Sequence, residues 1–385
     1  MSAPERAVVN EARDAEAVAR PRLDEIGLVA LRLVALITAI VGVPHFPDAA
    51  AERFVQIAHT AGLPWRDSPV EYAFGDWLVI RAVGWGSVAT ARALLGVVAF
   101  TADLVAWRAV AYGWGRAAAV RYLWLGAPLL IFIYRRSDLV AVALSALGLA
   151  LALRGRERTG GVSLGASILV KVWPLVISPA LVIERRSRAL TTAAIALAAG
   201  LVGWLLLGGT DALRQVGMFR GATGWELEST IGAVVWAVTG NHRFEAGANR
   251  TGTVPGAAPA LLLLVTLVAV TTIWLAARRR TSTTSAGPPA LAAVAALLVF
   301  APVFSPQYVA WLLPWAAIAG GDGRRWTGLA SVPVILTGTL VTLWYADVDL
   351  GPGGNQLVLG ARNLAVMAIV IAYLVRAART QPIDG

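Results

Sequence analysis

The chain has 385 residues, of which 57% are hydrophobic and only 15% are charged. Soluble proteins carry about 25% charged residues, so a cytosolic enzyme, a disordered protein and a secreted disulfide scaffold are excluded. The sequence contains no cysteine, which also excludes thiol catalysis and cysteine-ligated metals. This composition predicts an all-α, multi-spanning membrane protein.

A net charge of +10 is typical of proteins that bind nucleic acid and of membrane proteins whose basic loops set their topology. Most arginines stand in short clusters between long apolar runs, which favours the topology signal, and we therefore expect no nucleic-acid partner. Lysine is nearly absent. Lys171, inside an apolar run, is the only one in the chain.

The apolar runs predict one transmembrane domain over residues 26–376, between polar tails at 1–25 and 377–385. The polar start predicts no cleavable signal peptide, so the first run is expected to remain as a helix. Several runs are shorter than the roughly 20 residues that cross a bilayer, and these must tilt or lie in a thinned region. The predicted runs are Ile26–Val43, Ala89–Ala111, Ala117–Tyr134, Leu139–Leu153, Gly161–Ile183, Ala189–Leu207, Ala257–Ala277, Ala290–Phe304, Tyr308–Ala319, Trp326–Tyr345 and Leu357–Val375.

Clusters of arginine in short loops predict the cytoplasmic side of the membrane. Two of these clusters flank residues 161–183, so that stretch must rise and return as two half-helices that meet near Lys171 and Pro174, where proline ends a helix. A single crossing there is the alternative, and the total is about 11–12 spans. The clusters are Arg108/Arg116, Arg154/Arg156/Arg158, Arg185/Arg186/Arg188, Arg278/Arg279/Arg280, Arg324/Arg325 and Arg376/Arg379.

This orientation places two long loops, about residues 45–75 and 208–255, on the outer face. Loops longer than about 12–15 residues are usually functional, so we expect the active site on the outer, periplasmic side of a bacterial plasma membrane. The first loop places Asp48 directly after the first span and Glu71 near its far end. A carboxylate at a membrane boundary suits a general base for a hydroxyl, although solvated acids or helix caps are the alternative.

Two cations invite an anionic ligand. Arg136 lies in an outer turn against the positive-inside rule, and a guanidinium fits phosphate well; alternatively, Asp138 pairs with Arg136 and caps the next helix. Lys171 lies at membrane depth, where an ionisable group is expensive and usually functional. The alternative is a structural ion pair with a buried acid such as Asp103.

Further polar side chains fall on the same predicted face. Arg220, Trp225 and Glu228 lie in the second long loop, where a tryptophan is ordinarily an interface anchor. Gln307 and Tyr308 join two apolar runs and could hydrogen-bond a sugar. Arg362 and Asn363 lie about two turns inside the last span. The three histidines match no metal motif. Together these groups favour a lipid phosphate or pyrophosphate headgroup as ligand.

Several segments, in this order, resemble glycosyltransferase family 87 of the GT-C superfamily, whose members use polyprenyl-phosphate mannose. The resemblance covers roughly residues 40–370. It is carried by GLPWRDSPVEY (62–72), RSDLVAVAL (136–144), GVSLGASILVKVWPLVISPALV (161–182), GWELEST (224–230), FSPQYVAWLLP (304–314) and ARN (361–363).

The resemblance implies a GT-C bundle and an inverting transfer of a sugar, most simply mannose, to a lipid or glycolipid acceptor. By motif, Asp48 matches the family's general base, and electrostatic stabilisation of the departing phosphate falls to cations. A monophosphate held by cations needs no metal or other cofactor. The implied phosphate ligands are Arg136, Lys171 and Arg220, and the implied sugar or acceptor ligands are Glu71, Asp138, Glu228, Gln307 and Tyr308.

The sequence departs from the family pattern at two places. Ala73 and Phe74 stand where prolines are common, and Thr223 stands where an arginine often precedes the Gly-aromatic step, with Arg220 three residues earlier. Two other functions are alternatives: a flippase or exporter of lipid-linked sugars, which needs a polar path across the bundle, and a non-catalytic scaffold of envelope assembly.

Overall fold

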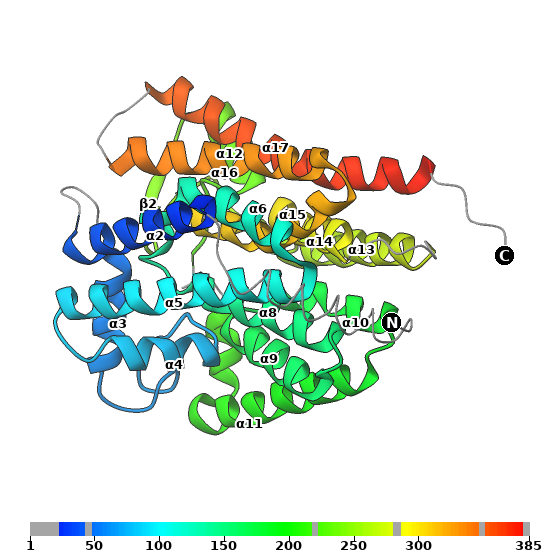
Figure 1. Cartoon of the computed structure of the whole chain (residues 1–385). Coiled ribbons are helices and arrows are strands. Elements are labelled where there is room, and N and C mark those ends of the chain that lie inside the picture. The colour runs from blue at the N-terminus through cyan, green and yellow to red at the C-terminus, as the bar shows by residue number, and fades with distance from the viewer. Residues whose placement is uncertain (1–22, 43–47, 218–221, 280–285, 346–350, 380–385) are drawn as a thin grey trace, which may run out of the picture.

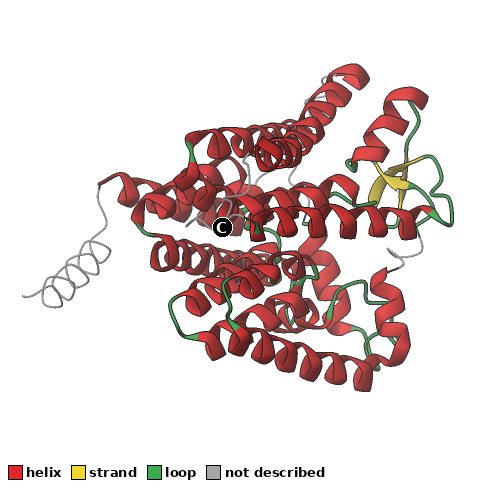
Figure 2. Cartoon of the chain, turned by 90° about the vertical axis from the view of Figure 1, so that its right-hand side faces the viewer, coloured by secondary structure: helices red, strands yellow, loops and turns green. Residues whose placement is uncertain are grey.

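The computed structural model describes residues 23–42, 48–217, 222–279, 286–345 and 351–379, and these are almost entirely helical (Figures 1 and 2). Arg220 lies outside them. Every predicted apolar run is helical over most of its length, which confirms the all-α class. The helices of the first half are α2 (Leu23–Val41), α3 (Ala49–His59), α4 (Phe74–Val83), α5 (Val88–Trp114), α6 (Arg116–Gly126), α7 (Leu130–Ile133), α8 (Asp138–Leu153), α9 (Glu157–Val170), α10 (Pro179–Ile183) and α11 (Ser187–Gly217).

The second half adds the rest of the bundle and a small sheet. Its helices are α12 (Thr230–Thr239), α13 (Ala258–Arg278), α14 (Gly287–Phe300), α15 (Leu313–Ala319), α16 (Arg324–Tyr345) and α17 (Gly351–Arg379), and its strands are β1 (Trp225–Glu226), β2 (Arg243–Glu245) and β3 (Ala248–Thr251). The strands are antiparallel in the order β1-β3-β2. Residues 351–356, which precede the last predicted apolar run, are also helical.

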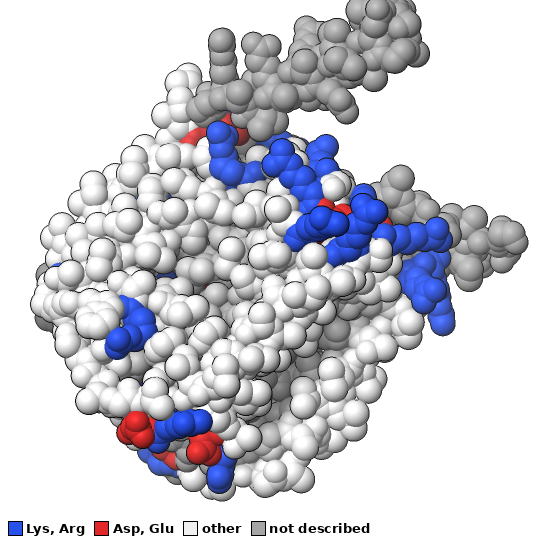
Figure 3. Space-filling model, turned by 90° about the horizontal axis from the view of Figure 1, so that it is seen from below, with Lys and Arg blue, Asp and Glu red and all other residues white. Residues whose placement is uncertain are grey.

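Six helices among the described residues are long and apolar enough to cross a membrane, so this is a multi-pass membrane protein. They are α5, the continuous segment Arg116–Ile133, α11, α13, α16 and α17. Apart from α2, which has 19 residues, the remaining apolar runs form shorter helices, and the total of 11–12 spans stays a prediction. Figure 3 shows largely uncharged surface between a large basic group at the upper right and two smaller groups of charged side chains at the left and lower left.

The stretch 157–186 leaves one end of the bundle and returns to it. At the start of this stretch, Glu157 accepts a hydrogen bond from the backbone N–H of Arg188 at 3.1 Å. Arg186 donates to the carbonyl of Leu153 at 3.0 Å. Between these ends, α9 stops at Val170, the backbone of Lys171 is extended, and a 3₁₀ turn (Trp173–Ile177) leads into α10. The predicted pair of half-helices is therefore present, and Lys171 lies where they meet.

Close helix packing holds this half-helix in position. A Cβ atom on Gly161 of α9 would lie 2.2 Å from the carbonyl oxygen of Ala189 in α11. Only glycine allows the two backbones to approach this closely, a common device where membrane helices pack. In the other half of the molecule α14 and α15 are buried over nearly their whole length and form the centre of the apolar core.

Candidate functional site

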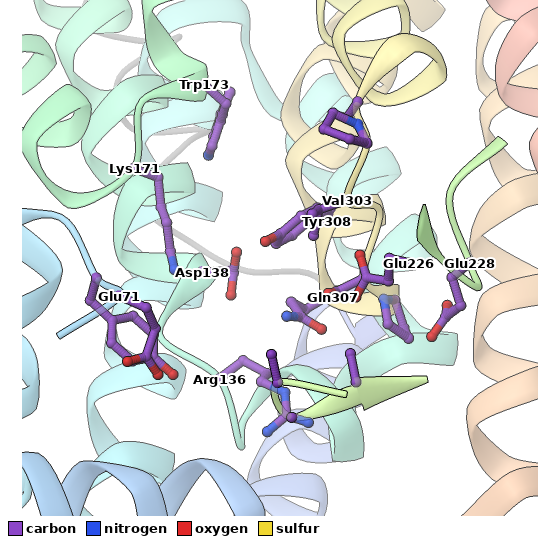
Figure 4. A pocket seen from close by; sticks show the side chains of 18 of the residues that line it. Glu71, Arg136, Asp138, Lys171, Trp173, Glu226, Glu228, Val303, Gln307 and Tyr308 are labelled. Carbon is purple, nitrogen blue, oxygen red and sulfur yellow. Dashed lines mark hydrogen bonds between the residues drawn. The ribbon is translucent and has the colours of Figure 1, made fainter. Parts of the chain in front are cut away.

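A cavity of about 1980 Å³ opens where α8, the two half-helices, the 301–308 segment and the small sheet meet. Pockets for small ligands are usually about 300–1,000 Å³, so this cavity can hold more than one group of a large substrate. Figure 4 shows charged and polar side chains that enter it from both sides. It is lined by seven of the nine site residues predicted from the sequence: Glu71, Arg136, Asp138, Lys171, Glu228, Gln307 and Tyr308.

Arg136 lies between the two sides of the cavity (Figure 4). It follows α7 in the turn that starts α8, and its guanidinium lies 5.0 Å from the centre of the Phe132 ring. The one hydrogen bond that its guanidinium makes in the described part of the chain goes to the carbonyl of Arg135 at 3.4 Å, and its buried Nε has none. No carboxylate of the described residues lies within 4 Å to neutralise it. The guanidinium of Arg136 therefore has N–H donors available for a ligand.

Asp138, the first residue of α8, is buried and does not form the predicted alternative pair with Arg136. Instead, one of its carboxylate oxygens accepts a hydrogen bond from Trp311 Nε1 at 2.9 Å. Trp311 stacks between Trp173 and Tyr308, with ring centres 5.3 and 4.1 Å apart. Sequence reasoning missed both tryptophans, because each resembles an ordinary core or interface aromatic. Together with Tyr308 they give the cavity an aromatic wall beside Asp138.

Lys171 forms an ion pair, but its partner is not the acid proposed as the alternative. Its Nζ lies 2.7 Å from Asp76 of α4, whose side chain is fully buried. The ammonium also lies 5.5 Å from the centre of the Tyr72 ring. Asp103 instead binds Arg32 at 2.8 Å. Lys171 still lines the cavity with about a fifth of its side chain exposed. The buried carboxylate of Asp76 therefore balances the charge of Lys171, and the ammonium group remains accessible to a ligand in the cavity.

Glu71 lies on the same side of the cavity as Lys171 (Figure 4). Arg53 of α3 binds both oxygens of its carboxylate, at 2.9 and 2.6 Å. Arg53 also donates to the carbonyl of Pro69, at 3.0 Å. This pair joins α3 to the segment that precedes α4 and fixes the carboxylate at the cavity edge.

Glu226 and Glu228 enter the cavity from the opposite side. Glu228 binds Arg362 of α17 at 2.7 Å, and Arg362 and Asn363 also donate to the Glu228 carbonyl. This contact accounts for the two polar residues that the sequence places inside the last span. Burial raises the pKa of Glu228 to about 7, against the opposing charge of Arg362. Glu226 was not predicted from the sequence.

Asp48 does not line the large cavity. Its carboxylate binds Arg92 at 2.5 Å and Arg135 at 3.2 Å. It shares a recess of about 10 Å³ with Arg136, beside the cavity wall formed by Ala49 and Ala50. A space of this size holds about one water molecule.

One part of the cavity wall is apolar and continues to the outside of the bundle. Val172 and Leu175 of the half-helix segment, and Leu263 and Leu267 of α13, line the cavity and are each about half exposed or more. Trp274 of α13 joins these two walls by donating to the carbonyl of Val176 at 2.8 Å. An apolar chain can therefore lie in this part while a polar headgroup occupies the rest.

The sequence model of glycosyltransferase family 87 matches residues 68–306, more than half of the chain. The match includes the Arg136 turn, the two half-helices and the segment with Glu226 and Glu228. No curated protein matches the sequence. Among the described residues, no group of three or more histidine, aspartate or glutamate side chains is close enough to hold a metal ion.

Proposed function

The chain belongs to glycosyltransferase family 87 and is a membrane glycosyltransferase; on that premise we propose that it transfers a sugar, mannose, from a polyprenyl-phosphate donor to a hydroxyl of a lipid or glycolipid acceptor. The transfer inverts the anomeric carbon. The observation that carries the proposal is Arg136, a cavity-lining guanidinium with no carboxylate partner in the described chain. Such a group suits a phosphate that gains charge as the glycosidic bond breaks.

The shape of the cavity supports a lipid-linked donor. The polyprenyl chain would lie along Val172, Leu175 and Leu263, where the wall reaches the apolar surface. The phosphate would bind Arg136 with help from Lys171, and Arg220, outside the described residues, stays a predicted third ligand. Glu71, Glu228, Gln307 and Tyr308 would orient the sugar or acceptor from the remaining wall.

In this mechanism an acceptor oxygen attacks the anomeric carbon while the bond from that carbon to the phosphate oxygen breaks. The acceptor proton passes to a carboxylate, for which Asp48 is our first candidate. The recess that Asp48 shares with Arg136 has room for about one water, and a general base can act through one water. Arg92 and Arg135 hold the carboxylate beside that recess.

Asp138 is the competing candidate for the base, because its carboxylate lies on the cavity wall itself between Lys171 and Tyr308 (Figure 4). Trp311 accounts for one of its oxygens and leaves the other for a substrate. The two candidates approach the same turn, because Asp138 ends it at the start of α8 and Asp48 binds its Arg135. Replacing each by its amide separates them, because the amide keeps the shape and removes the basic oxygen.

The test is transfer of radiolabelled mannose from polyprenyl-phosphate mannose to membrane lipid extract by the purified, lipid-reconstituted protein. Asp211, exposed on α11 and off the cavity wall, supplies the matched control Asp211→Asn. We expect Asp48→Asn to abolish transfer and Asp211→Asn to retain it. If Asp138→Asn abolishes transfer and Asp48→Asn does not, Asp138 is the general base. A wild-type protein that moves the donor between leaflets without transferring sugar contradicts the proposal and supports a flippase.

We also propose that the cavity faces the periplasm and that transfer needs no metal. The sequence contains no cysteine, so single cysteines report position cleanly. Asn241→Cys, near the cavity, should react with an impermeant thiol reagent in intact cells, whereas Arg158→Cys, at an exposed position in the first turn of α9, should react only after lysis. The reverse pattern contradicts the orientation. Transfer in excess chelator should equal transfer without it, and a loss that Mg²⁺ or Mn²⁺ restores contradicts metal independence.

A further inference from the structure

Glu226 has a carboxylate oxygen that the rest of the described chain leaves without a partner. The residue is 6% exposed, and its other oxygen accepts a hydrogen bond from Ser305 at 2.7 Å. Its Oε2 is buried and makes no hydrogen bond among the described residues, although the side chain lines the cavity. Buried polar atoms nearly always have a partner. An unused acceptor at a cavity wall therefore points to a ligand.

The local backbone holds Glu226 rigidly. In the sheet, β1 pairs Glu226 with Arg250. The carbonyl of Glu226 accepts from both the backbone N–H and the hydroxyl of Ser229, the residue that caps α12. A Cβ atom on Gly232 would lie 2.0 Å from that carbonyl oxygen, so α12 packs directly against it. With its backbone held by these contacts and one carboxylate oxygen held by Ser305, Glu226 is pre-organised for binding.

The surroundings select a neutral polar ligand. Glu228 and Glu226 together disfavour an anion at this wall, whereas the nearby positive charges of Arg250 and Arg362 disfavour a cation. Burial raises the pKa of Glu226, which favours the protonated acid relative to the carboxylate. A hydroxyl suits both states because it can donate and accept.

We propose that Glu226 binds a sugar hydroxyl and selects the substrate's sugar ring; this inference rests on the proposed sugar transfer. Gln307 lies beside Glu226 on the cavity wall (Figure 4), so neighbouring ring hydroxyls can be held together. The phosphate at Arg136 and the ring at Glu226 then occupy different parts of one cavity. The ring belongs either to the donor or to the acceptor.

The test combines a variant with a set of substrates that each lack one hydroxyl. The full-length protein in lipid nanodiscs is given polyprenyl-phosphate mannose, or octyl α-mannoside as acceptor, and the monodeoxy analogues of each. Wild type should use one analogue about 10–100-fold less well, the usual loss for a hydrogen bond to a charged group. Glu226→Ala should lose a similar factor with the complete substrate and show no further loss with that analogue. If this pattern appears with the donor analogues, Glu226 binds the donor's ring; if it appears with the acceptor analogues, Glu226 binds the acceptor's ring.

Glu245 of β2 offers the matched control Glu245→Ala, since it lies in the same sheet but off the cavity wall. The inference is overturned if Glu226→Ala transfers normally, or if it discriminates among the analogues as wild type does. A fluorescence titration with octyl α-mannoside supplies a second measurement, because Trp173 and Trp311 line the cavity. If wild type transfers no sugar, the proposed function fails, and weaker octyl α-mannoside binding by Glu226→Ala still supports the hydroxyl site. Equal binding of both octyl α-mannoside and polyprenyl-phosphate mannose by wild type and variant overturns it.

Discussion

Two groups of buried charges in this bundle differ in what their polar atoms contact. In the first, Asp103 accepts hydrogen bonds from Arg32, Tyr122 and Tyr134 at 2.6–2.8 Å, and Arg32 donates also to two backbone carbonyls. This closed network uses its polar atoms within the protein. In the second, the cavity wall, Arg136 and Glu226 keep buried atoms without hydrogen bonds in the described chain.

The comparison teaches how to read charges inside an apolar bundle. In a closed network each charged group has its partners within the folded protein. Removing one partner leaves the other charge buried and uncompensated. An open group contains buried polar atoms without hydrogen-bond partners, and a bound substrate can supply those partners. The Lys171–Asp76 pair is intermediate, since it is closed by charge yet lies on the cavity wall. Variants of each group should therefore separate stability from transfer.

The largest expected effect comes from breaking the closed network. Asp103→Leu leaves Arg32 uncompensated and removes the partner of two tyrosine hydroxyls, so we expect a loss of roughly 3–5 kcal/mol in stability. Thermal unfolding in lipid nanodiscs measures it. Asp24→Asn, an exposed acid of α2, is the control and should unfold as wild type does. An unchanged unfolding temperature for Asp103→Leu contradicts a structural role for the network.

The Lys171–Asp76 pair should show both kinds of effect. Lys171→Met strands a fully buried carboxylate, and we expect a stability loss of about 3 kcal/mol together with loss of transfer. The double variant Lys171→Met with Asp76→Leu should regain most of the stability, because neither charge remains. If the double variant also regains transfer, Lys171 serves only the fold and does not bind phosphate.

Arg136 should affect transfer alone. Removing one positioned donor for a developing negative charge typically costs about 10²–10³-fold in kcat, and we expect that loss in Arg136→Met at an unchanged unfolding temperature. Arg66→Gln replaces an exposed arginine that does not line the cavity and should retain activity. Normal transfer by Arg136→Met would remove the main support for phosphate binding.

The smallest expected effect concerns pH. The folded protein raises the pKa of Glu228 from 4.5 to about 7, so between these values the folded state binds a proton that the unfolded state lacks. This contribution to stability therefore falls as pH rises from about 4.5 to 7. Comparing unfolding temperatures at pH 5 and pH 8, wild type should lose more than Glu228→Gln. Equal changes in the two proteins contradict the raised pKa.

Local sequence patterns were sufficient for the helices and for part of the site. Hydrophobic runs give the bundle because each helix must satisfy its own backbone in lipid. The arginine clusters around residues 161–183 predicted the returning half-helices, and the contact of Glu157 with Arg188 confirms that both ends meet. Arg136 and Lys171 were identified because a cation at such a position is costly and needs a reason.

Other parts of the site could not be read from the sequence. Lys171 finds Asp76, 95 positions earlier, and Asp138 finds Trp311, 173 positions later. Nothing in the local pattern distinguishes Asp76 from Asp103 as a partner for Lys171. Glu226 resembled an ordinary loop acid, since its importance comes from an oxygen left unpaired by the surrounding fold.

The sequence by itself determined that this protein is a helical membrane bundle and indicated which cations lie at positions where a charge is costly. Both follow from single segments, because the length of a hydrophobic run and the cost of a buried charge are properties of each segment alone. Only the tertiary structure decided which charges are neutralised and which face a cavity. That outcome depends on distances between segments far apart in the chain, which helix packing sets and no single segment encodes.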